Sequence, residues 1–417
     1  MKQAVAALAL STCMTYLAGC AGGASVVGLS PAWRQRAAFS YESLYSFAGG
    51  ADGNGPEAAL LNVNGTLFGT TYSGGGTGCF MRGCGTVFEV SASGLEHVLY
   101  SFQGGTDGND PLAAVTNVGG TLYGTTVAGG GSGCYNGTGC GTIFEVLPSG
   151  TEQVIHSFQG PPDGQRPYAG LIDLSGTLYG TTGYGGTGAC KYIDEMGCGT
   201  VFAISDGVER IVYSFKGGKD GLDPYGSVIH VKGTLYGTTS QGGASGNGTV
   251  FEVSTAGVAR VLYSFKGGKD GSGPLGSLVN VKGMLYGATS AGGGSGCSMS
   301  GCGTIFTVST SGAEHVLYRF KGGRDGAYPY AGLVNFDGTL YGTTFFGGRL
   351  GCSASCGTIF KVSTSGAEQV LYRFQGTPDG ENSTAGLVQV GGALYGTTLS
   401  GGSLCSAGCG TVFEVTP

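Results

Sequence analysis

Short apolar runs alternate with glycine-rich stretches from residue 41 to residue 417. Most runs are about four to six residues long and rich in Val, Ile, Leu, Thr, Tyr and Phe, which is typical of strands and unfavourable for helices. In the first unit of the pattern we expect strands at residues 60–63, 66–71, 86–90 and 97–102. No helix is expected in this part of the chain.

The pattern repeats seven times along the chain. Copies of the phrase Leu-Tyr-Ser-Phe, or of a close variant, follow one another at intervals of 50 to 57 residues. They end at Phe47, Phe102, Phe158, Phe215, Phe265, Phe320 and Phe374. Short glycine-containing turns join the runs, as they do between antiparallel neighbours. Four antiparallel strands cannot bury both faces alone, so we expect the units to pack radially as blades.

The two ends of the repeat region complement each other. Residues 41–47 have the pattern of a fourth strand without the three that should precede it, whereas residues 385–415 supply three strands without a fourth. Pairing them would remove two exposed strand edges. We therefore predict an all-β, seven-bladed β-propeller over residues 41–417, with four antiparallel strands per blade and the last blade closed by the N-terminal strand.

The repeated phrases Leu-Tyr-Gly-Thr-Thr, Gly-Gly and Val-Phe-Glu-Val resemble those of the GloVer tandem-repeat family of bacterial surface proteins. The arrangement is also similar to kelch-type propellers, although the kelch tryptophan is absent and Trp33 precedes the repeats. The GloVer resemblance implies export and attachment to the cell surface. It implies no particular activity.

The first 19 residues have the pattern of an export signal, with Lys2 followed by an apolar run at residues 4–10. This run is too short to cross a bilayer as a helix. Leu17-Ala18-Gly19-Cys20 resembles the lipobox of bacterial lipoproteins, which implies cleavage before Cys20 and lipid attachment to its thiol. We expect residues 20–40 to be a tether and the protein to be lipid-anchored in the cell envelope, at the outer membrane or cell surface. The alternative is an ordinary secretory signal.

Twelve of the 14 cysteines form close pairs between the second and third strands of a unit. The fourth unit lacks both cysteines and part of the loop, which favours pairing within each loop. We predict six disulfides: Cys79–Cys84, Cys134–Cys140, Cys190–Cys198, Cys297–Cys302, Cys352–Cys356 and Cys405–Cys409. Each would contribute about 2 kcal/mol of stability outside the cytoplasm. The alternative is a metal site of four thiolates from two neighbouring pairs.

These cysteine loops and the crossings between blades should lie on one face of the propeller. Each crossing carries an Asp-Gly pair, with the carboxylates at Asp52, Asp107, Asp163, Asp220, Asp270, Asp325 and Asp379. We interpret Asp-Gly as a turn, because one carboxylate per loop is too few for calcium.

The same crossings hold our candidate ligand-binding residues. Three tyrosines follow a proline and should lie near the central channel: Tyr168, Tyr225 and Tyr330. A basic sector is expected from Lys216, Lys219, Lys266, Lys269, Lys321 and Arg324. The tyrosines could stack on sugar rings or hold a peptide. The alternative is that they pack between blades and that the charges are merely solvated.

Little in the sequence indicates catalysis. The net charge of −6 gives no basic footprint for nucleic acid, and no nucleophile, phosphate-loop or metal-ligand motif is present. His156 replaces the tyrosine found in the last strand of other units, but no nucleophile adjoins it in the sequence. We expect a monomer without cofactor or metal that binds a glycan, peptide or protein. The alternative is an exported polysaccharide hydrolase or lyase that uses loop aspartates as acid and base.

Overall fold

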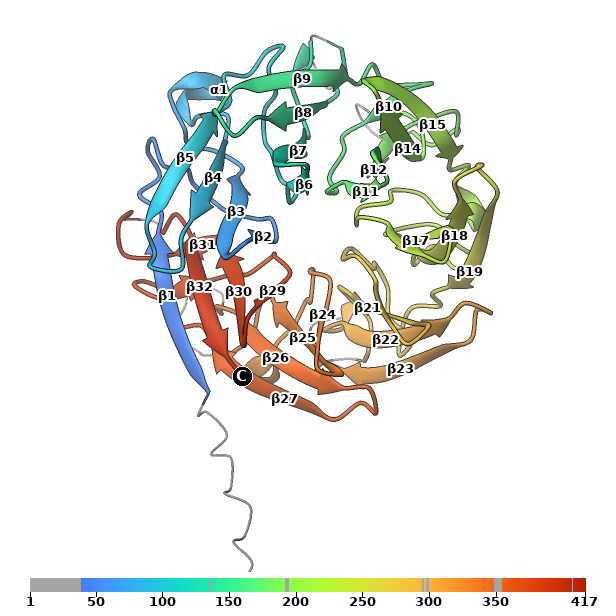
Figure 1. The fold of residues 1–417 in the computed structure, drawn as a ribbon. Coiled ribbons are helices and arrows are strands. Elements are labelled where there is room, and N and C mark those ends of the chain that lie inside the picture. Colours follow the sequence, from blue (N-terminus) through green and yellow to red (C-terminus); the bar gives the residue numbers. More distant parts are fainter. Residues whose placement is uncertain are drawn as a thin grey trace, which may run out of the picture. The chain divides into compact units, whose positions relative to one another are not determined.

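Four-stranded antiparallel sheets, arranged around a central opening, make up the repeat region in the computed structural model (Figure 1). The structure describes residues 39–131, 133–134, 137–191, 195–294, 296–297, 300–348, 355–406 and 408–417. The predicted signal segment, Cys20 and most of the predicted tether lie outside the described residues.

Each sheet runs from a short strand at the centre to a longer one at the outer edge. The first blade contains β2 (Leu61–Val63), β3 (Thr66–Thr71), β4 (Thr86–Val90) and β5 (Glu96–Ser101). The second contains β6 (Thr116–Val118), β7 (Thr121–Thr126), β8 (Thr142–Val146) and β9 (Glu152–Ser157). The third contains β11 (Ile172–Leu174), β12 (Thr177–Thr182), β14 (Thr200–Ser205) and β15 (Val208–Ser214).

The later blades keep this order. The fourth contains β16 (Ile229–Val231), β17 (Thr234–Thr239), β18 (Thr249–Ser254) and β19 (Ala259–Ser264). The fifth contains β20 (Val279–Val281), β21 (Met284–Thr289), β22 (Thr304–Ser309) and β23 (Glu314–Arg319). The sixth contains β24 (Val334–Phe336), β25 (Thr339–Thr344), β26 (Thr358–Ser363) and β27 (Glu368–Arg373).

The seventh blade closes the ring as the sequence predicts. It combines β29 (Val388–Val390), β30 (Ala393–Thr398) and β32 (Thr411–Thr416) with β1 (Ser40–Ser46). β1 pairs antiparallel with β32, so that Tyr41 lies opposite Val415 and Ser46 opposite Thr411. The prediction of a seven-bladed propeller closed by its N-terminal strand is therefore confirmed.

Small departures from the prediction lie in the loops and the outer strands. The sequence predicts no helix, but α1 (Gly78–Met81) forms a single helical turn at the start of the short loop that the Cys79–Cys84 disulfide closes. Two 3₁₀ turns, Gly218–Asp220 and Gly323–Asp325, lie in crossings between blades. Crossings also pair with the next loop through β10 (Gly164–Gln165) with β13 (Tyr184–Gly185), and β28 (Gly380–Glu381) with β31 (Ser400–Gly401). β5 begins one residue earlier than predicted and bulges where Val87 and Phe88 oppose Tyr100 and Val98.

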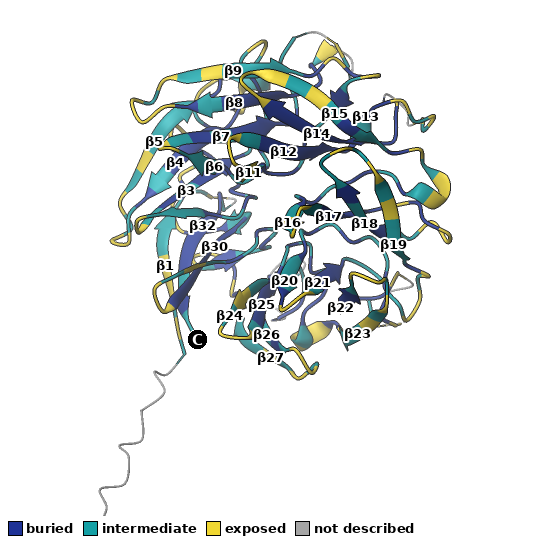
Figure 2. Cartoon of the chain, turned by 45° about the vertical axis from the view of Figure 1, so that its right-hand side comes forward, coloured by how far each residue is buried: buried dark blue, intermediate teal, exposed yellow. Residues whose placement is uncertain are grey.

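The hydrophobic core lies between neighbouring blades. In the first blade, the ring of Phe88 fills the space over Gly69, where a Cβ would come within 2.5 Å of the Phe88 ring. Phe47 from the seventh blade packs edge-to-face on Phe88, with ring centroids 5.1 Å apart. Equivalent Phe pairs recur around the ring. Figure 2 shows that the middle strands of the blades, such as β8 and β12, are mostly buried.

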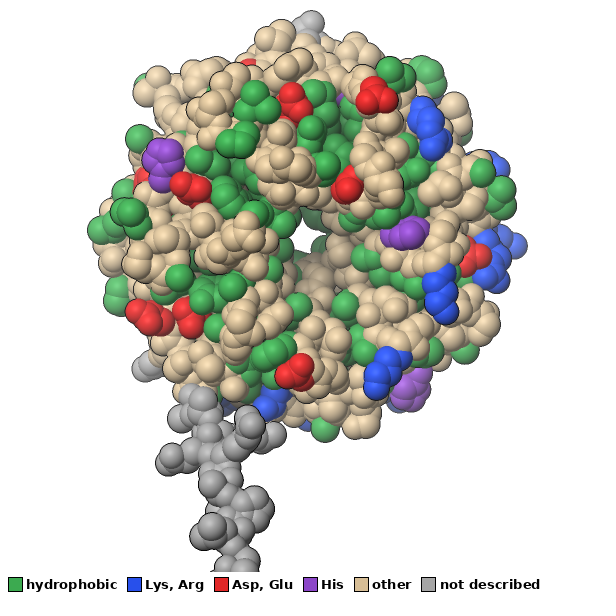
Figure 3. Space-filling view, viewed as in Figure 1, with side chains coloured by type: hydrophobic (Ala, Val, Ile, Leu, Met, Phe, Trp, Pro, Cys, Tyr) green, Lys and Arg blue, Asp and Glu red, His purple; other side chains and the backbone are tan. Residues whose placement is uncertain are grey.

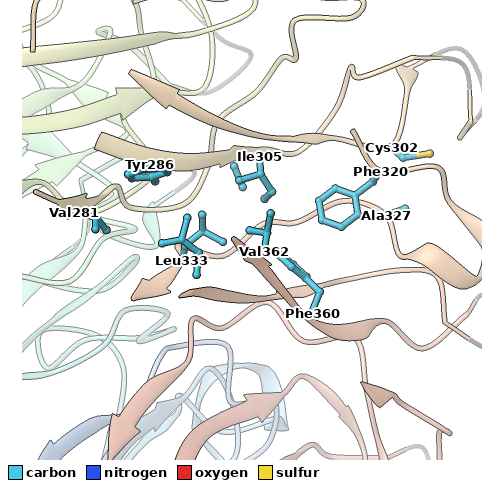
Figure 4. Packing of buried hydrophobic residues seen from close by; sticks show 11 residues of the cluster. Val281, Tyr286, Cys302, Ile305, Phe320, Ala327, Leu333, Phe360 and Val362 are labelled. Atoms are coloured by element: carbon cyan, nitrogen blue, oxygen red, sulfur yellow. The ribbon is translucent and has the colours of Figure 1, made fainter. Parts of the chain in front are cut away.

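Figure 4 shows one of these interfaces, between the fifth and sixth blades. Ile305 and Phe320 of the fifth blade point toward Leu333, Phe360 and Val362 of the sixth. Because each core cluster draws on two blades, no blade is expected to be stable alone. The closed ring therefore holds the residues around the central opening on a rigid frame.

Candidate functional site

A cavity of about 640 Å³ lies at the centre of the ring, where the crossings run into the innermost strands. In each blade the same position lines it, which is the residue after the proline in all blades except the seventh. The side chains at this position are Glu57, Leu112, Tyr168, Tyr225, Leu275, Tyr330 and Thr384. Small residues follow them and let neighbouring backbones approach closely; a Cβ on Gly170, for example, would come within 2.8 Å of the Ala114 carbonyl oxygen.

Buried threonines fix the backbone of this lining. Thr125 Oγ1 donates to the carbonyl of Ala169, beside Tyr168, at 3.1 Å, and Thr397 Oγ1 donates to the carbonyl of Ala58, beside Glu57, at 3.2 Å. These bonds run from the second strand of one blade to the next blade. The lining is therefore held by the frame and not by a mobile loop.

The structure places the three predicted tyrosines in the cavity wall. Tyr168 and Tyr225 stack on each other, with ring centroids 4.5 Å apart and an interplanar angle of 17°. Tyr330 tilts against Phe345, which also lines the cavity, at 5.2 Å. All three tyrosines are half-buried, so they combine packing between blades with an accessible aromatic surface. Their role in binding remains a prediction.

Glu57 supplies the only carboxylate among the described residues that line the cavity. Burial, and secondarily the negative charge of Asp110, raise its pKa from 4.5 to about 7. Burial also raises the pKa of Tyr225, and the charge of Glu57 contributes to that rise. Glu57 is not among the binding residues predicted from the sequence, although its place after Pro56 matches that of the three tyrosines.

A buried polar cluster supports the tyrosine side of the cavity. Arg166 forms an ion pair with Glu195, and its Nη1 donates to the hydroxyl of Tyr168 at 3.5 Å. Asp223 is 8% exposed, and its Oδ2 accepts a hydrogen bond from Ser240 Oγ at 2.6 Å. Burial raises the pKa of both Asp223 and Glu195, while Arg166 opposes the rise at Glu195. Within the part of the chain that the structure describes, Asp223 Oδ1 has no hydrogen-bond partner.

Both Arg166 and Asp223 directly precede the proline of a crossing and adopt positive φ, at 55° and 59°. This backbone geometry is uncommon for residues with a side chain. It is stabilised by hydrogen bonds: the Asp223 N–H donates to the Cys198 carbonyl at 3.0 Å, and the Ser240 N–H donates to the Asp223 carbonyl at 2.9 Å. The cluster is thus built into the connection between blades.

The predicted basic sector lies apart from the tyrosines. All six residues are exposed and sit in the crossings beside the outermost strands: Lys216, Lys219, Lys266, Lys269, Lys321 and Arg324. Lys266 and Lys321 lie over the rings of Tyr263 and Tyr318, at 5.8 Å from each centroid. Figure 3 shows the opening at the centre of the ring, and the visible Lys and Arg side chains gather mainly over the blades on the right of this view. The structure does not bring the basic residues into the cavity.

The aspartates of the crossings are engaged in structural hydrogen bonds. Tyr213 Oη donates to Asp220 at 2.9 Å, and the Lys216 N–H donates to the same carboxylate at 2.8 Å. The tyrosine and aspartate recur seven residues apart, at Tyr45–Asp52, Tyr100–Asp107, Tyr263–Asp270, Tyr318–Asp325 and Tyr372–Asp379. This constant spacing is visible in the sequence and would have indicated the pairing. The carboxylates thus stabilise the turns of the crossings, as the sequence predicts, and none of them lines the cavity.

Five of the predicted disulfides are described, and they join Cys79–Cys84, Cys134–Cys140, Cys190–Cys198, Cys297–Cys302 and Cys405–Cys409. Cys356 is disulfide-bonded as well, while its predicted partner Cys352 lies outside the described residues. Each described disulfide lies beneath the crossing of its own blade; a Cβ on Gly217 would come within 2.6 Å of Cys190 Sγ. In the fourth blade Asn247 occupies this place beneath Gly267.

The disulfides indicate an oxidising compartment, such as the periplasm or the cell exterior. Across the part of the chain that the structure describes, no helix has the length and apolar character required to cross a membrane.

Solved structures with a similar fold have very different sequences. A gluconolactonase from Xanthomonas campestris is 12% identical, with 91% of this chain and 90% of that chain covered and a TM-score of 0.44. A puromycin hydrolase mutant is 14% identical, with 83% and 50% covered and a TM-score of 0.49. A GH74 enzyme from Niastella koreensis is 14% identical, with 79% and 46% covered and a TM-score of 0.46. Similarity at this level carries no inference about activity.

None of the curated proteins compared with the chain matches it. The Gloeobacter/Verrucomicrobia repeat matches in three overlapping segments, residues 15–193, 80–300 and 295–417. These segments cover every blade, and the family is the one that the repeated phrases resemble. The chain is a member of the Gloeobacter/Verrucomicrobia repeat family.

Proposed function

We propose that this protein is an exported binding module whose central cavity holds the end of a carbohydrate chain. The observation that carries the proposal is the cavity itself, a preformed space of about 640 Å³ with aromatic and apolar walls and one carboxylate. Its size lies within the range of about 300–1,000 Å³ that small-molecule sites usually have.

The chemistry of the wall favours a neutral, hydroxyl-rich ligand. Tyr168, Tyr225 and Tyr330 supply apolar ring faces and edges with polar tips, which suit the C–H surfaces and hydroxyls of sugar rings. Glu57 can accept hydrogen bonds from hydroxyls when ionised and donate one when protonated. Because Arg166 is paired with Glu195, it offers little attraction to an acidic ligand. A peptide or protein ligand is the other class predicted from the sequence.

Binding is better supported than hydrolysis or lysis of a polysaccharide. Acid–base cleavage of a glycosidic bond usually needs two carboxyl groups about 5 to 10 Å apart across the bond. The loop aspartates predicted for this role accept hydrogen bonds from tyrosines at the outer edge. Within the described lining, Glu57 stands without a second carboxylate.

The lipid anchor on Cys20 belongs to the same proposal. The disulfides support export, and the lipobox-like sequence before Cys20 supports attachment to the envelope. Several acyl chains on one residue would give durable anchoring. Mass spectrometry of the N-terminal peptide from the native host would test it, and an unmodified Cys20 or a cleavage site elsewhere would refute it.

A glycan array followed by calorimetry tests the binding proposal, using the soluble form without residues 1–20. This form keeps β1 and therefore the closed ring. We expect the protein to bind one or a few related glycans, and we expect Tyr225→Leu to lower the affinity for them at least tenfold. Leucine occupies the same position in the second and fifth blades, at Leu112 and Leu275, so this variant should fold.

Lys269→Ala is the matched control, because Lys269 lies outside the cavity on an exposed crossing. It should bind like the unmodified protein. Equal binding by both variants, or loss only with Lys269→Ala, would refute the central site and favour the outer basic sector. Absence of any bound glycan, with capture of peptides instead, would redirect the proposal to the second ligand class.

A further inference from the structure

One blade breaks the tyrosine–aspartate pattern of the crossings. In β9 the position that holds tyrosine in the other blades holds His156, and its Nε2 lies 3.3 Å from Asp163 Oδ2. The imidazole packs edge-to-face on Phe158, with ring centroids 4.8 Å apart, as the tyrosines do on their own phenylalanines. The substitution therefore keeps the packing and replaces a phenol oxygen with a ring nitrogen.

Glu209 of the next blade completes a group of three. It lies on β15, so the group bridges the outer strands of the second and third blades. One ligand atom each from His156, Asp163 and Glu209 can be chosen so that all lie within 4.8 Å of one another. Glu209 Oε1 is buried and has no hydrogen-bond partner among the described residues. The side chains of His156 and Asp163 are 21% and 18% exposed, so an ion could reach the group from solvent.

We propose that His156, Asp163 and Glu209 form a binding site for a divalent transition-metal ion, with Zn²⁺ as its representative. One imidazole nitrogen with two carboxylate oxygens is a common donor set for such ions. The distance of 3.3 Å between His156 Nε2 and Asp163 Oδ2 equals the edge of a tetrahedron with metal–ligand bonds of about 2.0 Å. Glu209 needs to move inward by no more than about 1.5 Å to reach the same spacing.

The same geometry argues against Ca²⁺ and Mg²⁺. Ca²⁺ requires six to eight oxygen ligands and Mg²⁺ a near-ideal octahedron of oxygens, whereas this group offers two carboxylates and a nitrogen. Asp163 also accepts hydrogen bonds from the backbone N–H of Gln159 at 2.9 Å and of Gly164 at 2.6 Å. These bonds orient its carboxylate, as partners of metal ligands commonly do.

The other interfaces provide an internal comparison. Tyr100, Asp107 and Glu152 occupy the corresponding places between the first and second blades, where Tyr100 Oη donates to Asp107 Oδ1 at 2.9 Å. The two interfaces thus differ at the position of Tyr100 and His156. A neutral phenol is a poor metal ligand, so we expect His156 to decide which interface binds the ion. The site lies at the outer strands and does not depend on the proposed function of the central cavity.

Zinc binding by the purified full-length protein in detergent tests this inference. After removal of metal with a chelator, we expect isothermal titration with ZnCl₂ to show one site per chain and added Zn²⁺ to raise the melting temperature. His156→Tyr restores the residue of the other blades, so it should fold and should weaken zinc binding at least tenfold. His97→Gln, which removes an exposed histidine, should bind zinc like the unmodified protein.

Tyr100→His tests the reverse change. It should create a second site with Asp107 and Glu152 and raise the zinc stoichiometry from one to two. Zinc binding that survives His156→Tyr, zinc binding that His97→Gln removes, or the absence of binding by the unmodified protein would each overturn the inference.

Discussion

Glu57 should make the stability of the propeller depend on pH, and Glu57→Gln isolates that effect. Burial, and then the charge of Asp110, raise the pKa of Glu57 from 4.5 to about 7 in the folded protein. The folded state therefore holds the proton more tightly than the unfolded state. The contribution of Glu57 to stability is fully present below about pH 4.5 and is lost as the pH rises to about 7.

The size of the effect follows from the same values. One pKa unit corresponds to about 1.4 kcal/mol, so a rise from 4.5 to about 7 corresponds to about 3 kcal/mol of unfolding free energy. Glutamine resembles the protonated carboxyl and does not ionise. The unfolding free energy of Glu57→Gln minus that of the unmodified protein should therefore increase by about 3 kcal/mol from pH 4 to pH 8.

Urea denaturation followed by circular dichroism at pH 4, 6 and 8 measures this difference. A difference is needed because burial also raises the pKa of other carboxyls, such as Asp110 and Asp223, which lowers stability in the same pH direction. Glu57→Leu is the control for the amide, because it removes the charge without adding hydrogen-bonding groups. A stability difference that stays constant or shrinks from pH 4 to pH 8 would contradict a raised pKa at Glu57.

Three further variants test what stabilises the propeller. Cys190→Ser with Cys198→Ser opens a ring of nine residues and should lower the unfolding free energy by about 2 kcal/mol under oxidising conditions, with no difference after reduction. Gly124→Ala places a methyl group about 2.4 Å from the ring of Phe144 and should cost about 1–3 kcal/mol by overpacking, measured by urea denaturation. In the other blades a threonine at the position of Ala288 donates a hydrogen bond to the next blade, as Thr343 does to the Ala385 carbonyl. Ala288→Thr should therefore raise the unfolding free energy by about 1 kcal/mol, and a decrease would show that this bond cannot form from the fifth blade.

The repeat made most of the fold predictable. The strand pattern and the turn glycines recur in every unit, and the unmatched strands at the two ends require each other, as β1 and β32 show. The disulfides were predictable because the fourth blade lacks both cysteines of its loop. In each case the evidence lies within one unit or in a comparison of units, where the sequence is directly informative.

The polar clusters were not predictable in the same way. Arg166, Glu195 and Asp223 come from two crossings and a cysteine loop, and their contact depends on how closely neighbouring blades approach. His156 and Glu209 also belong to different blades, so their proximity likewise depends on how the blades pack. Glu57 differs from these residues, because the repeat alone fixes its position after Pro56. Its side chain has neither the aromatic character of the predicted tyrosines nor the charge of the predicted basic sector.

Departures from the sevenfold pattern are therefore the best guide to function in this chain. The phenylalanines over the strand glycines are the same residue type in every blade, because each packs into an interface of the same shape. The position that faces the cavity varies from Leu112 to Tyr225 to Glu57, although the backbone there is equally regular. Packing gives no reason for such variation, since leucine satisfies it in two blades. A requirement from a bound, asymmetric ligand does give a reason, and the same argument applies to His156 among the tyrosines of the crossings.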